Sequence, residues 1–266
     1  PIVAMCDAAV SATRRHYEHA VPVHIDVSLH SSMLTRLMQE GHARFERTAV
    51  IEDNGLHLLY DTWIKIIAEA FVQQSRFDPL HTAETEQMLQ DRLPEWLASA
   101  SSAATVALDI EFRGVSHQAE IESLELVAAA SPVYQNIVSK LRTFYRAEEL
   151  PAIQLSDRAA RMPGLADTLK TRVGGEVFLL EPGATARGLA KRCKANASGD
   201  KVALARHLNW DQTPVKVEVV SSGLNGGQPT HLLFGHTAFR LGRRPLVLGT
   251  QAAENERWLD LQQEMP

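Results

Sequence analysis

Cysteine is scarce in this chain of 266 residues, because Cys6 and Cys193 are the only two. Two cysteines so far apart in sequence form neither a disulfide framework nor a paired motif for zinc or redox chemistry. We therefore expect packed, idle thiols. The sequence predicts no metal site, since its scattered histidines also lack partners at ligand spacing.

Long apolar runs and basic clusters are missing as well. No stretch approaches the roughly 20 apolar residues of a membrane-spanning helix, and the first residues do not have the pattern of a secretion signal. Lysine and arginine number 27 against 32 acidic residues, for a net charge of −5. Because nucleic-acid binders concentrate basic residues on one surface, we expect neither nucleic acid nor membrane as a partner, and a cytoplasmic location.

The short motifs of self-contained active sites are also absent. No Gly-Lys pair occurs anywhere, so the glycine-rich stretch 223–227 is not a P-loop. The G-x-S-x-G, H-E-x-x-H and G-x-G-x-x-G patterns of hydrolases, metalloproteases and dinucleotide enzymes do not appear either. The sequence thus predicts no catalytic residue in this chain.

The first part of the chain predicts strands followed by a helix. A helix-like stretch at 4–19 comes first, and because it has no earlier element to pack on, it suggests a longer protein with an upstream domain. Short strand-like segments follow at 23–29, 32–37 and 44–52, separated by turn residues. A helix is expected at 58–74, where apolar residues recur at three- and four-residue steps.

The remaining elements are an insertion, a second α/β stretch and a tail. We expect residues 76–121 to form an inserted subdomain, with a helix at 82–97 that Pro94 should break and a hairpin after it. The elements expected next are helices at 124–145, 162–172 and 184–193 and strands at 152–156 and 176–180. Residues 1–193 would form one domain, and residues 200–266 a small β-rich C-terminal region beyond a polar linker.

This order resembles one lobe of the actin-like ATPases, whose core is similar to ribonuclease H. Local sequence is similar to the DnaK-type heat-shock chaperones at 23–36, 101–110 and 152–164, and at 184–190, which reads Ala-Thr-Ala-Arg-Gly-Leu-Ala. The resemblance implies an α/β fold with a mixed five-stranded sheet flanked by helices. It also implies a site for Mg-ATP.

The residues at that implied site depart from the family pattern. The family has Asp-Leu-Gly-Gly-Gly-Thr where this chain has Asp26-Val27-Ser28-Leu29-His30-Ser31. Glycines matter in such a loop because the backbone amides must approach phosphate without a Cβ in the way. Asp26 is kept, while Ser28, Leu29 and His30 replace the glycines and Ser31 replaces the threonine.

The nucleoside side of the implied site departs in the same way. A Gly-Gly pair of the family corresponds to Asp157 and Arg158, and its Glu-x-x-Lys-Arg clamp corresponds to Pro94, Leu97 and Ala98. Asp26, Ser28, Ser31, Asp157 and Arg158 are thus the degenerate nucleotide-site positions. Two readings stay open: Asp26 is a relic metal-water ligand or a hydrogen-bonded strand-end carboxylate, and Arg158 binds an anion or belongs to an ion-paired surface.

Three functions compete at this stage. The first is a non-catalytic interaction module, a pseudo-ATPase fragment without a cofactor, which holds a protein partner that includes an upstream lobe of the same polypeptide. The second is a nucleotide-dependent, chaperone-like ATPase whose other lobe lies upstream and binds ATP and Mg²⁺. The third, a ribonuclease H-like nuclease, needs three or four clustered carboxylates, and only Asp26 is a strong candidate.

Overall fold

The computed structural model describes most of the chain. The described residues are 2–146, 148–194, 197–198 and 201–217, and the strands at 231–234, 237–240, 246–249 and 257–260. They fall into two compact units, Pro1–Val220 and Ser221–Pro266.

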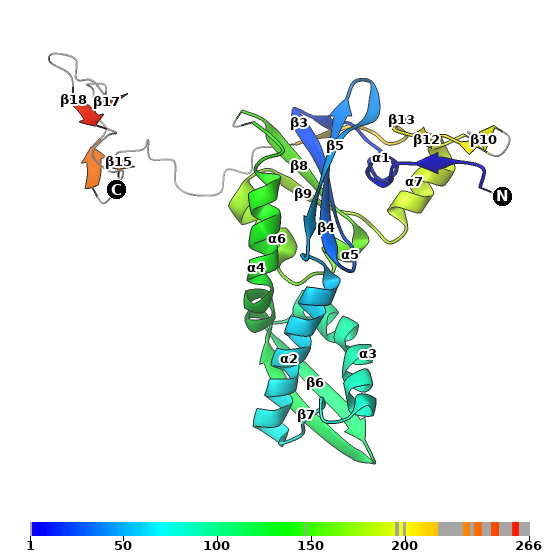
Figure 1. Ribbon diagram of the computed structural model, residues 1–266, viewed down its shortest axis with the longest axis vertical. Helices are drawn as coiled ribbons and strands as arrows, with labels where there is room; N and C mark the ends of the chain where they lie inside the picture. Colours follow the sequence, from blue (N-terminus) through cyan, green and yellow to red (C-terminus); the bar gives the residue numbers. More distant parts are fainter. Residues whose placement is uncertain are drawn as a thin grey trace. The chain divides into compact units, whose positions relative to one another are not determined.

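The first unit is built on a mixed sheet of six strands with helices on its faces (Figure 1). The strands are β3 (Ala20–Val27), β4 (Ser31–Gln39), β5 (His42–Glu52), β8 (Leu150–Leu155), β9 (Glu176–Leu179) and β13 (His207–Asn209). Their order is β13-β5-β4-β3-β8-β9, with antiparallel pairing from β13 to β3 and parallel pairing from β3 to β9. The unit is therefore mixed α/β, as expected. The expected count of five strands was wrong, because β13 covers the edge of β5 that would otherwise stay unpaired.

Side chains of β3 alternate between two covered faces of this sheet. Val23, Ile25 and Val27 are fully buried on one face, in the main hydrophobic core. The helices that contribute to this core are α2 (Leu56–Ser75), α3 (Ala83–Ala100), α4 (Ser123–Leu141), α5 (Asp157–Ala160) and α6 (Leu165–Val173). On the other face lie α1 (Ala8–Ala12) and α7 (Ala184–Arg192). These two helices pack closely, since a Cβ at Gly188 would lie 1.9 Å from the backbone oxygen of Ser11.

The expected insertion forms a limb beyond the sheet. In Figure 1, α2 runs from the sheet into this limb, where it meets α3 and the antiparallel hairpin of β6 (Thr105–Phe112) and β7 (Val115–Glu122). Pro94 does not break α3, contrary to the prediction. Pro94 is exposed, while Leu93, Trp96 and Leu97 are buried beside it, so tertiary packing holds the helix through the proline. Pro132 likewise lies inside α4.

The segment 4–19 is not the single helix that its pattern suggested. It contains β1 (Met5–Cys6), α1 and β2 (Tyr17–Glu18), and Asp7 caps the start of α1 through the amides of Ala9 and Val10. Distant strand partners explain the difference. β1 pairs with β12 (Leu204–Ala205), and β2 pairs with β14 (Val215–Lys216).

These pairings also bear on where the tail begins. The sequence analysis assigned residues 201–217 to the C-terminal region, but they contribute β12, β13 and β14 to the first unit. The boundary between the two units in the sequence therefore follows Val220. A short hairpin of β10 (Ala197–Ser198) and β11 (Lys201–Val202) precedes them. In the second unit, β15 (His231–Phe234) pairs with β16 (Thr237–Arg240), and β17 (Leu246–Gly249) pairs with β18 (Arg257–Asp260). The remaining residues expected in this region lie outside the described ones.

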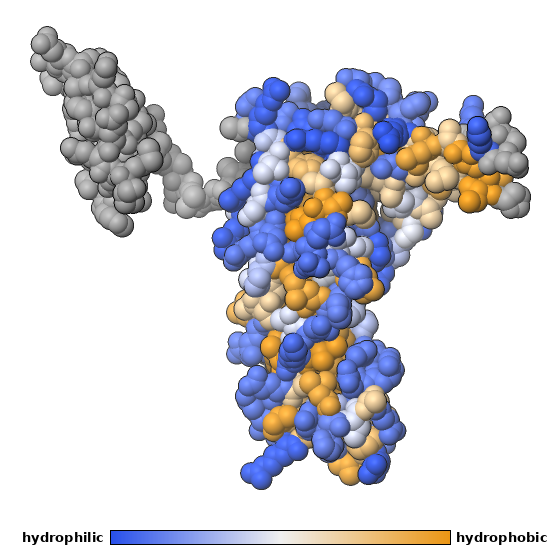
Figure 2. Space-filling model, viewed as in Figure 1, coloured by the Kyte–Doolittle hydropathy of each residue, from blue (hydrophilic) through white to orange (hydrophobic). Residues whose placement is uncertain are grey.

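Apolar side chains also reach the surface. Figure 2 shows hydrophobic residues near the N-terminus, around the paired strands β1 and β12. The exposed apolar residues in these segments are Ile2, Val3, Met5 and Leu204. Within the described part of the chain, no helix is both long and apolar enough to cross a membrane.

An ion pair fastens the segment before β8 to the sheet. Arg36 on β4 donates to both carboxylate oxygens of Glu149, at 2.8 and 2.9 Å, and also to the backbone oxygen of Phe144. Hydrogen bonding to Arg36 lowers the pKa of Glu149 from 4.5 to about 2. The folded state therefore prefers the charged carboxylate, and this stabilisation is present above pH 4.5 and is lost as the pH falls through about 2.

We predict that Glu149→Gln lowers the free energy of unfolding at pH 7 by about 1–3 kcal/mol, since it weakens a charge-assisted hydrogen bond. The deficit should shrink steadily as the pH falls from about 4.5 to about 2. Urea denaturation of both proteins at pH 7, 4 and 2.5 measures it, with the exposed neighbour Glu148→Gln as the matched control. An equal deficit at pH 7 and pH 2.5 would contradict the ion-pair account.

Candidate functional site

The turn between β3 and β4 carries two of the predicted site residues. The amide of Ser28 donates to the backbone oxygen of Ser31 at 2.8 Å, and the two hydroxyls lie 2.9 Å apart. The Ser28 hydroxyl also donates to the backbone oxygen of Ser31. Leu29 and His30 form the exposed tip. The two serines thus close a tight hairpin, and their hydroxyls bond to the hairpin itself.

The start of α2 lies directly against this turn. The amides of Leu56 and His57 donate to the backbone oxygens of Ser28 and Leu29, at 2.9 and 2.8 Å. Gly55 makes the approach possible, because a Cβ there would lie 2.5 Å from three backbone atoms of the turn. First-turn amides of a helix have no partner within the helix and commonly bind anions. Here the chain's own carbonyls occupy two of them.

A buried asparagine holds the turn from below. Asn54 is 1% exposed, and its backbone N–H donates to the backbone oxygen of His30 at 3.2 Å. Its side chain bonds to the Ser32 hydroxyl and to the backbone oxygen of Val133 on α4, and it accepts from Asn136. The turn, the start of α2 and α4 are therefore joined in one hydrogen-bonded network.

Asp26 lies at the end of β3, and both oxygens of its carboxylate accept hydrogen bonds. One oxygen accepts from the Ser156 hydroxyl at 2.6 Å and from the amide of Val27 at 3.0 Å, and the other accepts from Arg158 at 2.7 Å. Of the two readings of Asp26, this geometry is that of the hydrogen-bonded strand-end carboxylate. Arg158 forms part of an ion-paired surface.

The structure brings some of the predicted site residues together and leaves others apart. Asp26 and Arg158 contact each other, and so do Ser28 and Ser31. Asp157 is instead paired with Arg161 at 2.8 Å, one turn further along the chain.

Sequence reasoning missed Ser156, which joins Asp26 to the start of α5 by capping the amide of Ala159. A serine just before an Asp-Arg-Ala-Ala run is a typical N-cap signal and could have revealed it.

A small cavity of about 140 Å³ lies between α2, α3 and the segment after β8. Leu56, Tyr60 and Trp63 of α2 line one side, and Pro94 and Leu97 of α3 line another. Arg158, Arg161 and Met162 complete the walls. The cavity is thus mostly apolar, and salt bridges to Asp26 and Asp157 hold both of its arginines. Pockets that bind small molecules usually enclose about 300–1,000 Å³, so this cavity is small for a ligand.

No family model matches the chain, and no curated protein sequence matches it.

Asp26 has one titratable neighbour on its own strand. His24 precedes it by two residues on β3, and burial lowers the pKa of this histidine, so the imidazole is neutral at pH 7. Across the described residues, no three His, Cys, Asp or Glu side chains gather as a metal ion would require. The arrangement joins backbone segments to one another, and the carboxylate of Asp26 is already hydrogen-bonded within the protein.

We predict that Gly55→Ala pushes the turn away from α2 and exposes the first-turn amides. Its backbone φ of −116° suits any residue, so the effect comes only from the close approach. Hydrogen exchange measured by NMR should speed up at Leu56 and His57, and the protein should lose about 1–3 kcal/mol of stability. Gly114→Ala is the control: its φ of +76° strains an alanine, but nothing lies within 4 Å of the added Cβ, so it should destabilise the β6–β7 turn and leave both amides protected. Unchanged exchange at Leu56 and His57 in Gly55→Ala would count against the contact.

Proposed function

We propose that this chain is a non-catalytic interaction module, built on one lobe of the actin-like, heat-shock-chaperone ATPase type. One observation carries the proposal. The hairpin that would have to cradle phosphate instead packs its backbone onto the start of α2, and Ser28 and Leu29 accept the amides found there. The chain's own backbone thus takes the place of an anion.

The architecture supports the choice of this lobe. Three antiparallel strands, a helix, an insertion and then alternating strands and helices follow one another in the order that the resemblance implied. The two segments compared with the family's nucleoside site also line the same small apolar cavity. Arg158 belongs to the segment that corresponds to the Gly-Gly pair, and Pro94 and Leu97 belong to the segment that corresponds to the clamp. The proximity of these segments, which are distant in sequence, supports the choice of this lobe.

The same residues argue against nucleotide binding. A bound phosphate would lack the hydrogen bonds that the glycine amides donate in the family. Each missing hydrogen bond to a charged group costs about 1.5–3 kcal/mol of binding free energy. Mg²⁺ would have to compete with Arg158 for the Asp26 carboxylate, which already accepts three hydrogen bonds. The cavity of about 140 Å³ is also much smaller than the pockets that usually enclose a ligand. In this proposal the chain binds protein surfaces, and one of them belongs to an upstream lobe of the same polypeptide.

Titration calorimetry with Mg-ATP and Mg-ADP tests the proposal. We predict no saturable binding up to about 1 mM nucleotide, because the loss of three charged hydrogen bonds weakens binding by over three orders of magnitude. Arg158→Ala is the matched variant. It frees one oxygen of Asp26 but leaves the turn and α2 in contact, so it should not restore binding.

A dissociation constant below about 10 μM that rises on Asp26→Asn would overturn the proposal. It would favour the nucleotide-dependent ATPase, whose other lobe would then share the bound nucleotide.

A further inference from the structure

A second depression, of about 380 Å³, lies beside the end of β9, away from the turn and the small cavity. Its walls come from residues 12–17, from the end of β9 and the start of α7, and from Gln212. Tyr17 and Phe178 pack against each other there, with ring centroids 4.8 Å apart. We call this depression the β9 groove. It has a mixed lining, with arginines on one side and strand backbone on the other.

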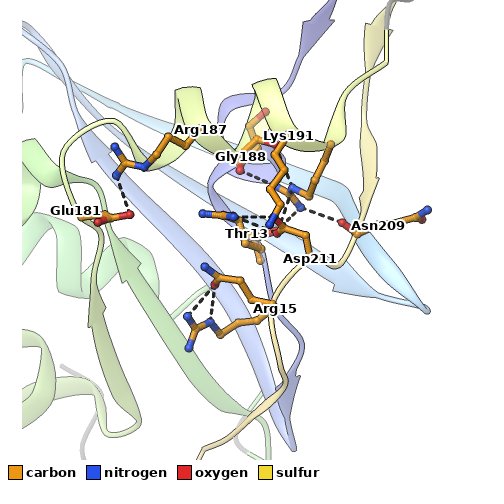
Figure 3. A network of polar contacts seen from close by, with 12 residues as sticks. Thr13, Arg15, Glu181, Arg187, Gly188, Lys191, Asn209 and Asp211 are labelled. Atoms are coloured by element: carbon orange, nitrogen blue, oxygen red, sulfur yellow. Dashed lines mark hydrogen bonds and ion pairs between the residues drawn. The ribbon is translucent and has the colours of Figure 1, made fainter.

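The arginine side carries positive charge that acidic residues do not fully offset. Arg15 donates two hydrogen bonds, of 2.9 and 2.7 Å, to the side-chain oxygen of Gln212 (Figure 3). This oxygen is a neutral acceptor, so it does not offset the charge of Arg15. Arg14 is paired with Asp211 at 2.6 Å, but that same carboxylate also serves Lys191 at 3.3 Å.

A third cation adds to this imbalance. Arg192 lies 3.7 Å from Asp211, so three cations share this one carboxylate. Glu181 in the groove wall is paired with Arg187 at 2.7 Å. The arginine side therefore has a local excess of positive charge, although the whole chain has a net charge of −5.

The opposite wall comes from the end of β9, the last strand of the sheet. β9 is the last strand in the sheet and pairs with β8 alone, and among the described residues no strand lies on its outer edge. The amide of Leu180 donates to the backbone oxygen of Leu155 on β8, at 2.9 Å. Because backbone directions alternate along a strand, the amide of Leu179 faces the outer edge. Leu179 is also 59% exposed, so solvent reaches this residue.

We propose that the β9 groove binds an extended acidic peptide, which adds as a strand to the edge of β9. Strand addition supplies main-chain hydrogen bonds, and side chains on the groove face give specificity. A Glu or Asp of the peptide would meet Arg15, whose planar guanidinium suits a carboxylate. Apolar residues of the peptide would contact Leu179 and Phe178. This inference rests on the proposed function as an interaction module and names the chemistry of one partner.

Fluorescence polarisation with a labelled peptide of eight alternating Val and Glu residues tests the inference, with a Val and Lys peptide as the reversed-charge probe. We expect saturable binding of the acidic peptide, at least tenfold tighter than that of the basic one. Raising NaCl from 50 to 500 mM should weaken binding, because partly exposed charges are screened.

Two variants separate the two halves of the groove. Arg15→Glu should weaken binding of the acidic peptide at least tenfold. Leu179→Pro should do the same, because it removes an outward amide without breaking the pairing with β8. Lys65→Glu on α2, with the same change of charge at an exposed site, should leave binding unchanged. Thermal unfolding of each variant checks that the fold is kept.

Equal binding of the two peptides, or acidic-peptide binding that survives Arg15→Glu or Leu179→Pro, overturns the inference. So does the absence of binding up to about 1 mM acidic peptide. None of these outcomes bears on nucleotide binding, so the groove can fail while the proposed function stands. Tight binding of Mg-ATP would overturn the proposed function whatever the peptide does.

Discussion

The contact between the β3–β4 turn and the first turn of α2 is the constraint on which much of the first unit depends. Gly55 lets two backbones approach so closely that no side chain fits between them. The turn carbonyls accept the amides at the start of α2, and Asn54 ties the same corner to α4. Because α2 leads into the inserted limb, this corner sets the direction of the limb from the sheet. It also occupies two of the first-turn amides that an anion could use.

The consequences extend to the neighbouring strand end. Asp26 finds its partners in Ser156 and Arg158, so the end of β3 is tied to the start of α5 within the protein itself. The space between α5, α2 and α3 shrinks to a small apolar cavity. A carboxylate, a helix start and a cleft can together form a binding site. Here the Asp26 carboxylate and two amides at the start of α2 bond to the protein itself, and the cavity beside them is small. Function would then belong to outer surfaces, such as the free edge of β9.

Much of the fold could be predicted because local pattern and tertiary structure agree there. The strands around residues 23–52, the helix at 58–74 and the hairpin at 105–121 appear where alternation and helical spacing placed them. The failures have a common cause. Residues 4–19 and 201–217 take their structure from strand partners far away in sequence, which no local pattern encodes. Pro94 stays helical because Trp96 and Leu97 are buried beside it.

The sequence indicated which residue types occupy the candidate site, but it did not indicate which contacts those residues make. Replacement of the glycines at 28–30 suggested the loss of a phosphate cradle, yet nothing local indicated that α2 would be capped by that turn. The family relationship and the function stay predictions.

The most direct test of the closed site is an NMR titration of ¹⁵N-labelled protein with Mg-ATP, which follows the amides of Leu56, His57 and Ala159. The account predicts that these three signals stay in place up to about 1 mM nucleotide, since the turn and Ser156 already bond all three. Saturable shifts of the Leu56 and His57 signals at micromolar Mg-ATP would contradict it.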